Sequence, residues 1–258
     1  MIGIASGLSA SGKTAFAYSI APFITSRCLD QIRIDVCYHE RHVILVGVGG
    51  GFVYGSLGAT HHAIEDIAIM RALPGMTVIA PADPQEAELA TVAAYQHNGP
   101  VYLRLGRNND PVVYKAKSDF IIGRAKVVHE GTDATIIATG TAVSPAIEAG
   151  EMLMKNGYTV RVVDMHTVKP IDKEAILDAA DTGIVATLED HTIFGGLGSA
   201  VAEVLAERPH SPCAFVRLGL QDVFCRDVGS VEYMRGSYGL DPVTVSKKIM
   251  SLIQETRG

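Results

Sequence analysis

Two adjacent histidines, His61 and His62, are the residues in this sequence whose type and spacing most clearly suggest chemistry. They follow a glycine-rich stretch and precede a run of apolar residues at helical spacing, and Thr60 before them can cap that helix with its hydroxyl. The free N–H groups and positive dipole end of such a helix favour an anion or a developing oxyanion. The pair is a candidate site, and a surface loop with two helix-capping histidines is the open alternative.

The run after the histidines predicts an amphipathic helix. The face expected to be buried holds Ile64, Ile67, Ala68 and Leu73. The face expected to point away from the core holds Glu65, Asp66 and Arg71.

The stretch from Gly7 to Thr14, GLSASGKT, fits the phosphate-binding pattern GxxxxGK[ST]. That loop needs a buried strand before the glycines and a long helix after the threonine. Here the preceding residues suit a short helix that ends at Gly12, and Pro22 stops any helix that would follow. A phosphotransferase site around Lys13 therefore stays a disfavoured alternative.

Three further stretches are candidates for ligand contacts. The glycine run 47–51, GVGGG, follows a strand but has no helix after it, so a loop at the end of a strand is favoured over a dinucleotide site. Arg107 follows the last strand of the first half, where it could grip a phosphate or simply be solvated. The glycine loop 195–198 could bind an anion or bring backbone close to a neighbouring subunit.

Composition excludes several classes of protein. The chain has 258 residues, 48% of them hydrophobic, which is ample for a folded core. A net charge of −6 without a recurring basic patch argues against nucleic acid as a partner. The longest apolar run is too short and too rich in glycine to span a membrane, and no secretory signal opens the sequence, so a cytoplasmic location is expected. The four cysteines lack CxxC spacing and suggest core thiols rather than a zinc site or a disulfide framework.

Strand-like and helix-like segments alternate along the chain, which predicts parallel sheets covered by helices. In the first half we expect strands at 15–19, 43–48, 77–80 and 101–105, and helices at 23–38, 61–73 and from Asp83, with Glu86 completing a capping box. Residues 106–119 are polar and aperiodic and predict a linker, followed by a hairpin-like stretch at 120–128. In the second half we expect strands at 134–138, 159–164, 183–188 and 214–218, and helices at 144–156, 173–180, 199–206 and from Pro242.

Several of these motifs together resemble one family. The runs GATHHAIEDIAIMRALPGMTVIAPAD and VYLRLGR resemble the pyrimidine-binding domain of transketolase-like enzymes that use thiamine diphosphate. The runs VRVVDMHTVKPID and LEDHTIFGGLGSAVAEVLAE resemble the transketolase C-terminal domain. The likeness covers nearly the whole chain, in order, and is strongest to the C-terminal subunit of a split transketolase. It implies an α/β fold of two domains, each a mostly parallel sheet with helices on both faces: 1–113, a pyrimidine-binding domain without its first strand and helix, and 120–258, a transketolase C-terminal domain.

The resemblance also implies a reaction, cofactors and a site. The family transfers a two-carbon ketol unit between sugar phosphates with thiamine diphosphate and Mg²⁺, the ion being held mainly by the partner subunit. Phe23 matches the aromatic residue that stacks on the cofactor's aminopyrimidine ring, Ile20 occupies the place of a second aromatic, and Arg27 matches an arginine of the split forms. His61 matches the histidine at the reacting oxygens of the substrate, and Arg107 matches the arginine that binds the sugar phosphate.

Three departures from the family pattern qualify this implication. Ser56 and Leu57 stand where relatives carry an acidic pair, and Gly49 stands where full-length relatives carry another substrate histidine. A modified sugar or a shorter keto compound is therefore open as substrate. The family's catalytic glutamate belongs a few residues before the position of Met1, so we expect the chain alone to be inactive. Its expected partners are an N-terminal subunit that carries the diphosphate-binding domain and a second copy of the same chain.

Two other functions stay open at this point. The same domains occur in the β-type subunit of 2-oxo acid dehydrogenases and in deoxyxylulose phosphate synthase. A non-catalytic assembly partner whose site has decayed would also explain the missing acidic residues.

Overall fold

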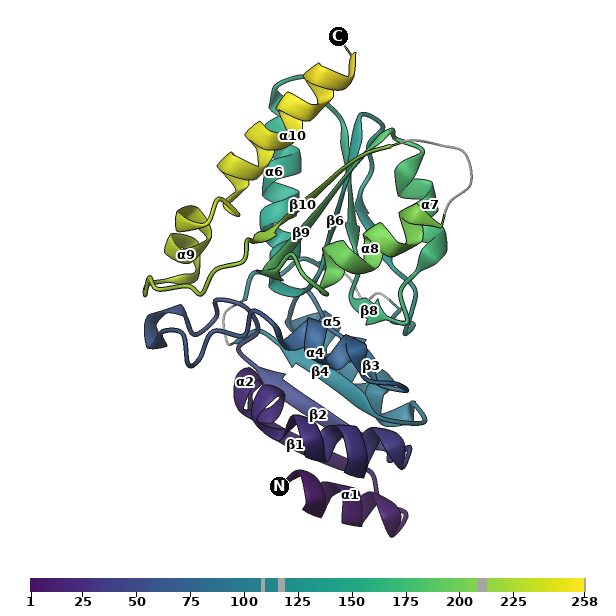
Figure 1. Ribbon diagram of the computed structural model, residues 1–258. Coiled ribbons are helices and arrows are strands. Elements are labelled where there is room, and N and C mark those ends of the chain that lie inside the picture. The colour runs from purple at the N-terminus through teal and green to yellow at the C-terminus, as the bar shows by residue number, and fades with distance from the viewer. Residues whose placement is uncertain (108–109, 116–118, 208–212, 258) are drawn as a thin grey trace.

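The computed structural model describes residues 1–107, 110–115, 119–207 and 213–257, and it has two stacked five-stranded sheets (Figure 1). The strands of the first sheet run in the order β1-β2-β4-β3-β8, and those of the second in the order β10-β9-β6-β7-β5. The first sheet's strands are β1 (Ala15–Ile20), β2 (Val43–Val48), β3 (Thr77–Ile79), β4 (Val101–Leu105) and β8 (Thr167–Lys169). The second sheet's are β5 (Lys126–His129), β6 (Ala134–Ala138), β7 (Val160–Asp164), β9 (Ile184–Thr192) and β10 (Ala214–Leu220). Among these described strands only β8 and β5 pair antiparallel, so the predicted α/β fold with mostly parallel sheets is confirmed.

Helices cover both faces of the first sheet. Its central strand β2 is buried on both sides, which is typical of a parallel sheet. One side packs against α1 (Ile2–Ala10) and α4 (Asp66–Ala72), and the other packs against α5 (Pro84–Gln96). Asp83 caps α5 by accepting from the Glu86 N–H at 2.7 Å, as predicted. Glu86 itself accepts from the Ala82 N–H, so the second half of the capping box is shifted by one residue.

The helix expected at 23–38 is broken into short pieces, so that prediction is only partly right. The pieces are α2 (Ala21–Ile24), a 3-10 turn (Ser26–Cys28), α3 (Leu29–Gln31) and a π-helix (Ile32–Tyr38). The break lies at Thr25, whose backbone leaves the helical region and whose hydroxyl donates to the Ala21 carbonyl at 2.7 Å. A threonine that bonds back to its own turn competes with the regular ladder.

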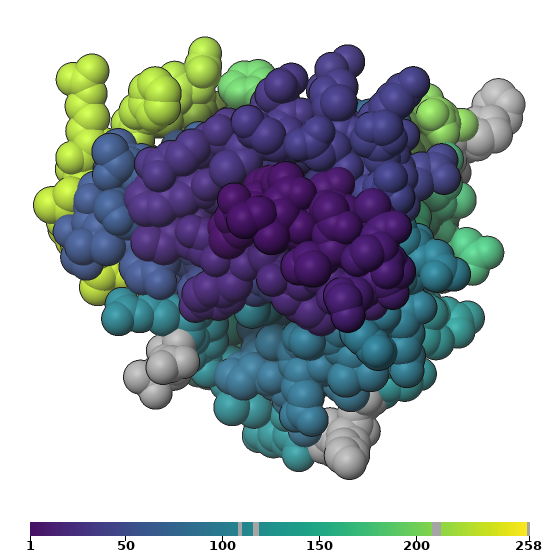
Figure 2. All heavy atoms as spheres, turned by 90° about the horizontal axis from the view of Figure 1, so that it is seen from below, coloured from purple at the N-terminus to yellow at the C-terminus, as the bar shows by residue number. Residues whose placement is uncertain are grey.

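The N-terminal motif is not a phosphate-binding loop. Helix α1 precedes the turn, Gly12 ends it with a φ of +82°, and strand β1 follows. This order is the reverse of the strand, loop and helix that cradle a phosphate. Figure 2 shows this N-terminal segment in the middle of one face of the molecule, where Ile4 and Leu8 of α1 are exposed.

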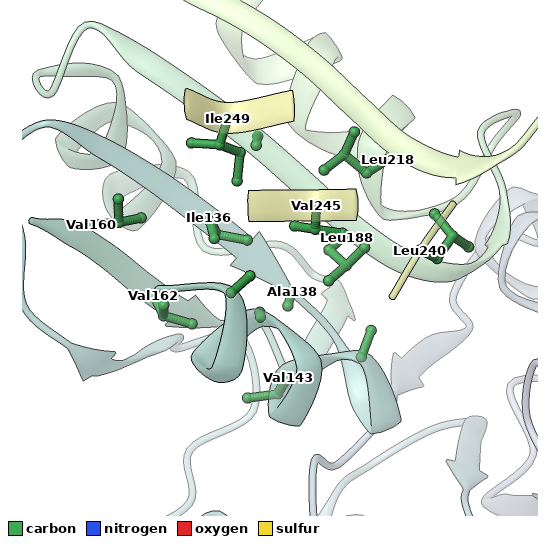
Figure 3. Packing of buried hydrophobic residues seen from close by; sticks show 14 of the residues in the cluster. Ile136, Ala138, Val143, Val160, Val162, Leu188, Leu218, Leu240, Val245 and Ile249 are labelled. Atoms are coloured by element: carbon green, nitrogen blue, oxygen red, sulfur yellow. The ribbon is translucent and has the colours of Figure 1, made fainter. Parts of the chain in front are cut away.

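The second sheet is also covered on both faces. Helices α6 (Val143–Lys155) and α10 (Pro242–Arg257) lie on one side, and α7 (Lys173–Ala180) and α8 (Leu197–Ala206) lie on the other (Figure 1). Figure 3 shows the core beneath α6 and α10, where Ile136, Leu188 and Ile249 meet. The hairpin expected at 120–128 is wrong, because β5 pairs antiparallel with β7 instead of with a neighbouring strand. Sequence reasoning also missed the strand β8 and the helix α9 (Val231–Ser237).

The two halves are joined by a shared strand. Strand β8 belongs to the second half of the chain, but it pairs antiparallel with β3 of the first sheet. The Lys169 ammonium at its end donates to the Arg71 carbonyl at 3.0 Å. The division at 1–113 and 120–258 stays a prediction, and part of the predicted linker, 108–109 and 116–118, lies outside the described residues.

Two buried carboxyl groups lie close together where α5 meets the second half. Asp164 accepts a hydrogen bond from the Tyr114 hydroxyl at 2.6 Å, and Glu86 lies 3.4 Å from the Lys126 ammonium. Burial raises the pKa of Asp164 well above its usual range, and the charge of Glu86 raises it further. Burial also raises the pKa of Glu86. Because Lys126 stabilises the charge of Glu86, we assign the retained proton to Asp164.

Candidate functional site

The candidate residues lie at the carboxyl edge of the first sheet. Strands β1, β2 and β4 are adjacent and parallel, with Ile20 opposite Val48 and Val48 opposite Leu105. The chain after each strand end therefore enters the same region, which is where open α/β sheets bind ligands. Phe23 follows the first strand end, the loop 49–65 follows the second, and Arg107 follows the third.

Four of the predicted residues and one unpredicted residue form a continuous row of rings and cations. The Arg27 guanidinium carbon lies 4.3 Å from the centre of the Phe23 ring. The ring of Phe23 is 5.1 Å from that of His61 at an edge-on angle of 62°. On the other side of His61 lies Tyr54, at 6.4 Å between ring centres, and the Arg107 guanidinium carbon lies 5.4 Å from the Tyr54 ring. The fold thus brings together residues from three separate strand ends, whereas the fifth predicted residue, Ile20, is the last residue of β1 and not a member of the row.

The loop that carries His61 is longer than the sequence predicted. Helix α4 begins at Asp66 and its N-cap is Glu65, so the expected helix start at Thr60 is wrong. The Thr60 hydroxyl instead bonds to Nδ1 of His61 at 3.0 Å. The half-exposed imidazole of His61 is therefore oriented by its neighbour and does not lie at a helix N-terminus.

His62 has a structural role instead. Its ring is buried and its Nε2 bonds to the Gly55 carbonyl at 3.1 Å. The ring also meets the buried Phe52 edge-on at 6.3 Å. These contacts fold the loop back on itself and leave His61 as the histidine available to a ligand.

A buried ion pair beneath the loop fixes its end. The Arg104 guanidinium donates to Asp66 at 2.8 Å and to the Ala63 carbonyl at 2.9 Å, and the Tyr102 hydroxyl donates to Asp66 at 2.6 Å. Asp66 is 2% exposed, so the expectation that it points away from the core is wrong. Burial alone would raise the pKa of Asp66, but the charge and hydrogen bonds of Arg104 lower it below its usual range. The carboxylate is thus held ionised under the site.

The second half of the chain completes this support. The Arg104 guanidinium also donates to the Asp190 carbonyl at 3.1 Å, and the Asp190 carboxylate accepts from Thr141 at 3.0 Å and from Arg235. A Cβ at Gly51 would lie 2.5 Å from that of Asp190, so only glycine lets the loop pass this close. Sequence reasoning missed this network, and its only signal was the charge of residues inside apolar segments.

The glycine loop 195–198 does not offer an anion site. The Glu189 carboxylate accepts from the Leu197 N–H at 2.7 Å and from the Gly198 N–H at 2.8 Å. The chain's own carboxylate therefore caps α8, and the anion-binding alternative from the sequence is wrong.

Arg107 is exposed and lines a cleft of about 540 Å³. The cleft lies over the carboxyl ends of β2 and β4 and is also lined by Tyr18, Leu105 and Asp110. The Asp110 carboxylate accepts from the Arg107 backbone N–H at 2.8 Å, which leaves the guanidinium to the cleft and to Tyr54.

Comparison with known proteins identifies the family. Residues 1–112 match the family described as "Transketolase, pyrimidine binding domain", and residues 123–245 match "Transketolase, C-terminal domain". The chain belongs to the transketolase family. The resemblance noted in the sequence is thereby confirmed, and the matched ranges correspond to the two sheets of the fold.

Several relatives of this transketolase-family chain are separate subunits or sections of a transketolase. It is 43% identical over 254 residues to "Putative transketolase C-terminal section" of Methanocaldococcus jannaschii, covering 97% of this chain and 78% of that protein. It is 39% identical to a subunit of an apulose-4-phosphate transketolase of Phocaeicola vulgatus, covering 98% and 81%. A solved structure described as "Split gene transketolase, inactive beta4 tetramer" is 40% identical with a TM-score of 0.90, covering 98% and 80%. A "1-deoxy-D-xylulose-5-phosphate synthase 1" of Geobacter sulfurreducens is 36% identical over 246 residues, but the chain spans only 38% of it.

The residues at the sheet edge fit the pyrimidine half of thiamine diphosphate. The ring of Phe23 is half-buried, is held at one edge by His61 and has a cation over one face, so it can present an aromatic surface to a flat heterocycle. No grouping of three or more potential metal-ligating side chains occurs in the described part of the chain. Among the described helices, none is both long and apolar enough to cross a membrane.

Proposed function

We propose that this chain is the C-terminal subunit of a two-subunit transketolase that transfers a two-carbon ketol unit between sugar phosphates. The observation that carries the proposal is the row from Arg27 through Phe23 and His61 to Arg107. It joins an aromatic surface to a free guanidinium at the sheet edge where α/β folds bind ligands.

The proposal gives each residue of the row one task. Phe23, Ile20 and Arg27 hold the aminopyrimidine ring by stacking and apolar contact. When bound, thiamine diphosphate supplies the nucleophilic carbon that makes and breaks the carbon–carbon bond. His61 donates to the substrate oxygen next to that bond, and Thr60 orients its ring for this. Arg107 binds the substrate's phosphate, for which an exposed planar guanidinium is suited.

The proposed enzyme needs a second polypeptide. The two matched ranges, 1–112 and 123–245, are the pyrimidine-binding and C-terminal domains, and we assign the diphosphate and Mg²⁺ to an N-terminal partner subunit. The similar split transketolase is described as an inactive β4 tetramer, which supports association of this chain with copies of itself and inactivity when it is alone.

Reconstitution tests the proposal. The chain is mixed with its N-terminal partner, Mg²⁺ and thiamine diphosphate, and transfer from a ketose phosphate to an aldose phosphate is measured. We expect transfer by the complex and none by the chain alone. Consumption of pyruvate without ketol transfer would instead favour deoxyxylulose phosphate synthase chemistry, which the similarity to such a synthase keeps as a second candidate. A complete complex that binds no cofactor would refute both and favour a non-catalytic assembly partner.

A further inference from the structure

Tyr54 occupies the position between the two proposed ends of the substrate. Its half-buried ring lies 6.4 Å from the His61 ring and 5.4 Å from the Arg107 guanidinium carbon. A sugar phosphate with its carbonyl at His61 and its phosphate at Arg107 must therefore pass the Tyr54 side chain.

The floor beneath this ring is fixed. A Cβ placed on Gly49 would lie 2.2 Å from two carbons of the Tyr54 ring, so the ring fills the space that any side chain at position 49 would occupy. Gly49 has a φ of +84°, and its N–H donates to the Leu105 carbonyl at 2.9 Å, just before Arg107. The ring is thus seated on backbone that is tied to the strand end carrying Arg107.

The hydroxyl of Tyr54 is available to a ligand. It makes no hydrogen bond with any residue in the described ranges, in contrast to the buried Tyr102 and to Tyr114. The neighbouring Ser56 and Leu57 are exposed and bring no charge to this part of the loop. Tyr54 is therefore the polar side chain of the row that lies between the histidine and the arginine.

We propose that Tyr54 is a specificity-determining residue, whose ring and hydroxyl select the acceptor by the length and hydroxylation of the chain between its carbonyl and its phosphate. The proposal rests on the ketol transfer proposed above. The ring limits the space that a branched or longer acceptor needs, and the hydroxyl bonds to a hydroxyl in the middle of the acceptor. A site built to bond a substrate hydroxyl rejects an analogue that lacks it more strongly than an apolar wall does.

The test uses the holoenzyme reconstituted with its partner subunit, Mg²⁺ and thiamine diphosphate. Values of kcat/KM are measured for aldose phosphates of increasing chain length and for a deoxy analogue of the best one. Tyr54→Phe should lower kcat/KM for the best acceptor about tenfold, mainly through KM, and leave the deoxy analogue unchanged. Tyr54→Ala should reduce the preference between chain lengths by a similar factor. The matched control is Tyr95→Phe, at a tyrosine that is 58% exposed on α5, and it should change neither ratio.

The outcomes separate this inference from the function on which it rests. If wild-type complex transfers ketol units and both Tyr54 variants keep its acceptor preferences, the role of Tyr54 is wrong while the function stands. If the wild-type complex transfers none, the proposed function fails and this inference fails with it. Unchanged cofactor affinity in Tyr54→Phe verifies that the variant is folded, so a loss confined to hydroxylated acceptors reports the missing hydroxyl.

Discussion

Replacing Asp66 by asparagine tests whether the buried ion pair holds the catalytic loop in place. The change keeps the size of the side chain and removes its charge, so Arg104, whose side chain is 3% exposed, loses its counter-ion. Breaking a buried pair from one side costs about 3–5 kcal/mol, because the remaining charge is left without compensation. The Ala63 and Asp190 carbonyls still accept from Arg104, so we expect a loss near the lower end, about 3 kcal/mol.

Urea unfolding of the purified chain measures this loss. With a slope of about 2–3 kcal/mol per molar, the midpoint should fall by about 1–1.5 M. The matched control is Glu207→Gln, which removes a carboxylate from a pair with Lys173 in which both side chains are mostly exposed. Such surface pairs contribute at most about 1 kcal/mol, so the control midpoint should move little.

Two results would refute the reasoning. One is a loss below about 1 kcal/mol in Asp66→Asn, which would mean that the charge is not needed there. The other is equal losses in Asp66→Asn and Glu207→Gln, because burial is the physical difference between the two pairs. The double variant Asp66→Leu with Arg104→Met should be more stable than either single variant, since it leaves no unpaired charge.

Four further predictions follow from the site and from the buried carboxyl pair. Phe23→Ala should weaken thiamine diphosphate binding by the complex by about 1–3 kcal/mol, measured by titration, through lost stacking and burial. His61→Ala should lower kcat with little change in cofactor affinity, and a loss of affinity instead would argue for a structural role. Arg107→Ala should raise KM for phosphorylated sugars and spare unphosphorylated ones, and equal damage to both would count against phosphate binding. Because the folded state raises the pKa of Asp164, its contribution to stability is complete below the unfolded pKa and is lost as pH rises through the folded pKa. In unfolding measured across pH from about 4 upward, Asp164→Asn should therefore gain on the wild type by up to about 1.4 kcal/mol per unit, and a constant difference would contradict the assignment of the proton.

Local patterns were sufficient for most of the regular elements. Strands β2 and β4 were predicted with their observed bounds, because runs of β-branched and apolar residues between turn signals specify a buried strand. The start of α5 at Asp83 and the short helix that ends before Gly12 followed from cap and turn residues whose preferences are local. Phe23, His61 and Arg107 were likewise named from the sequence as one site, because the resemblance supplied their relation.

The failures share a different cause. Asp66 and Arg104 are far apart in sequence, and their burial depends on a partner that no local pattern announces. The same holds for β8, whose three residues form a strand only because β3 offers them an edge. Glu189 filled the helix start at 197–198, where the sequence left room for an external anion. Tyr54 joined the row only when the loop was folded over Gly49.

The sequence by itself determined the alternation of strands and helices, the family and the chemical types of the candidate residues, because these depend on neighbours along the chain. Only the tertiary structure decided which histidine is buried, which carboxylates are paired and which ring lies between His61 and Arg107. The physical reason is that the burial and pairing of a charge or ring depend on long-range contacts, and these exist only after the strand ends have been brought to one edge of the sheet.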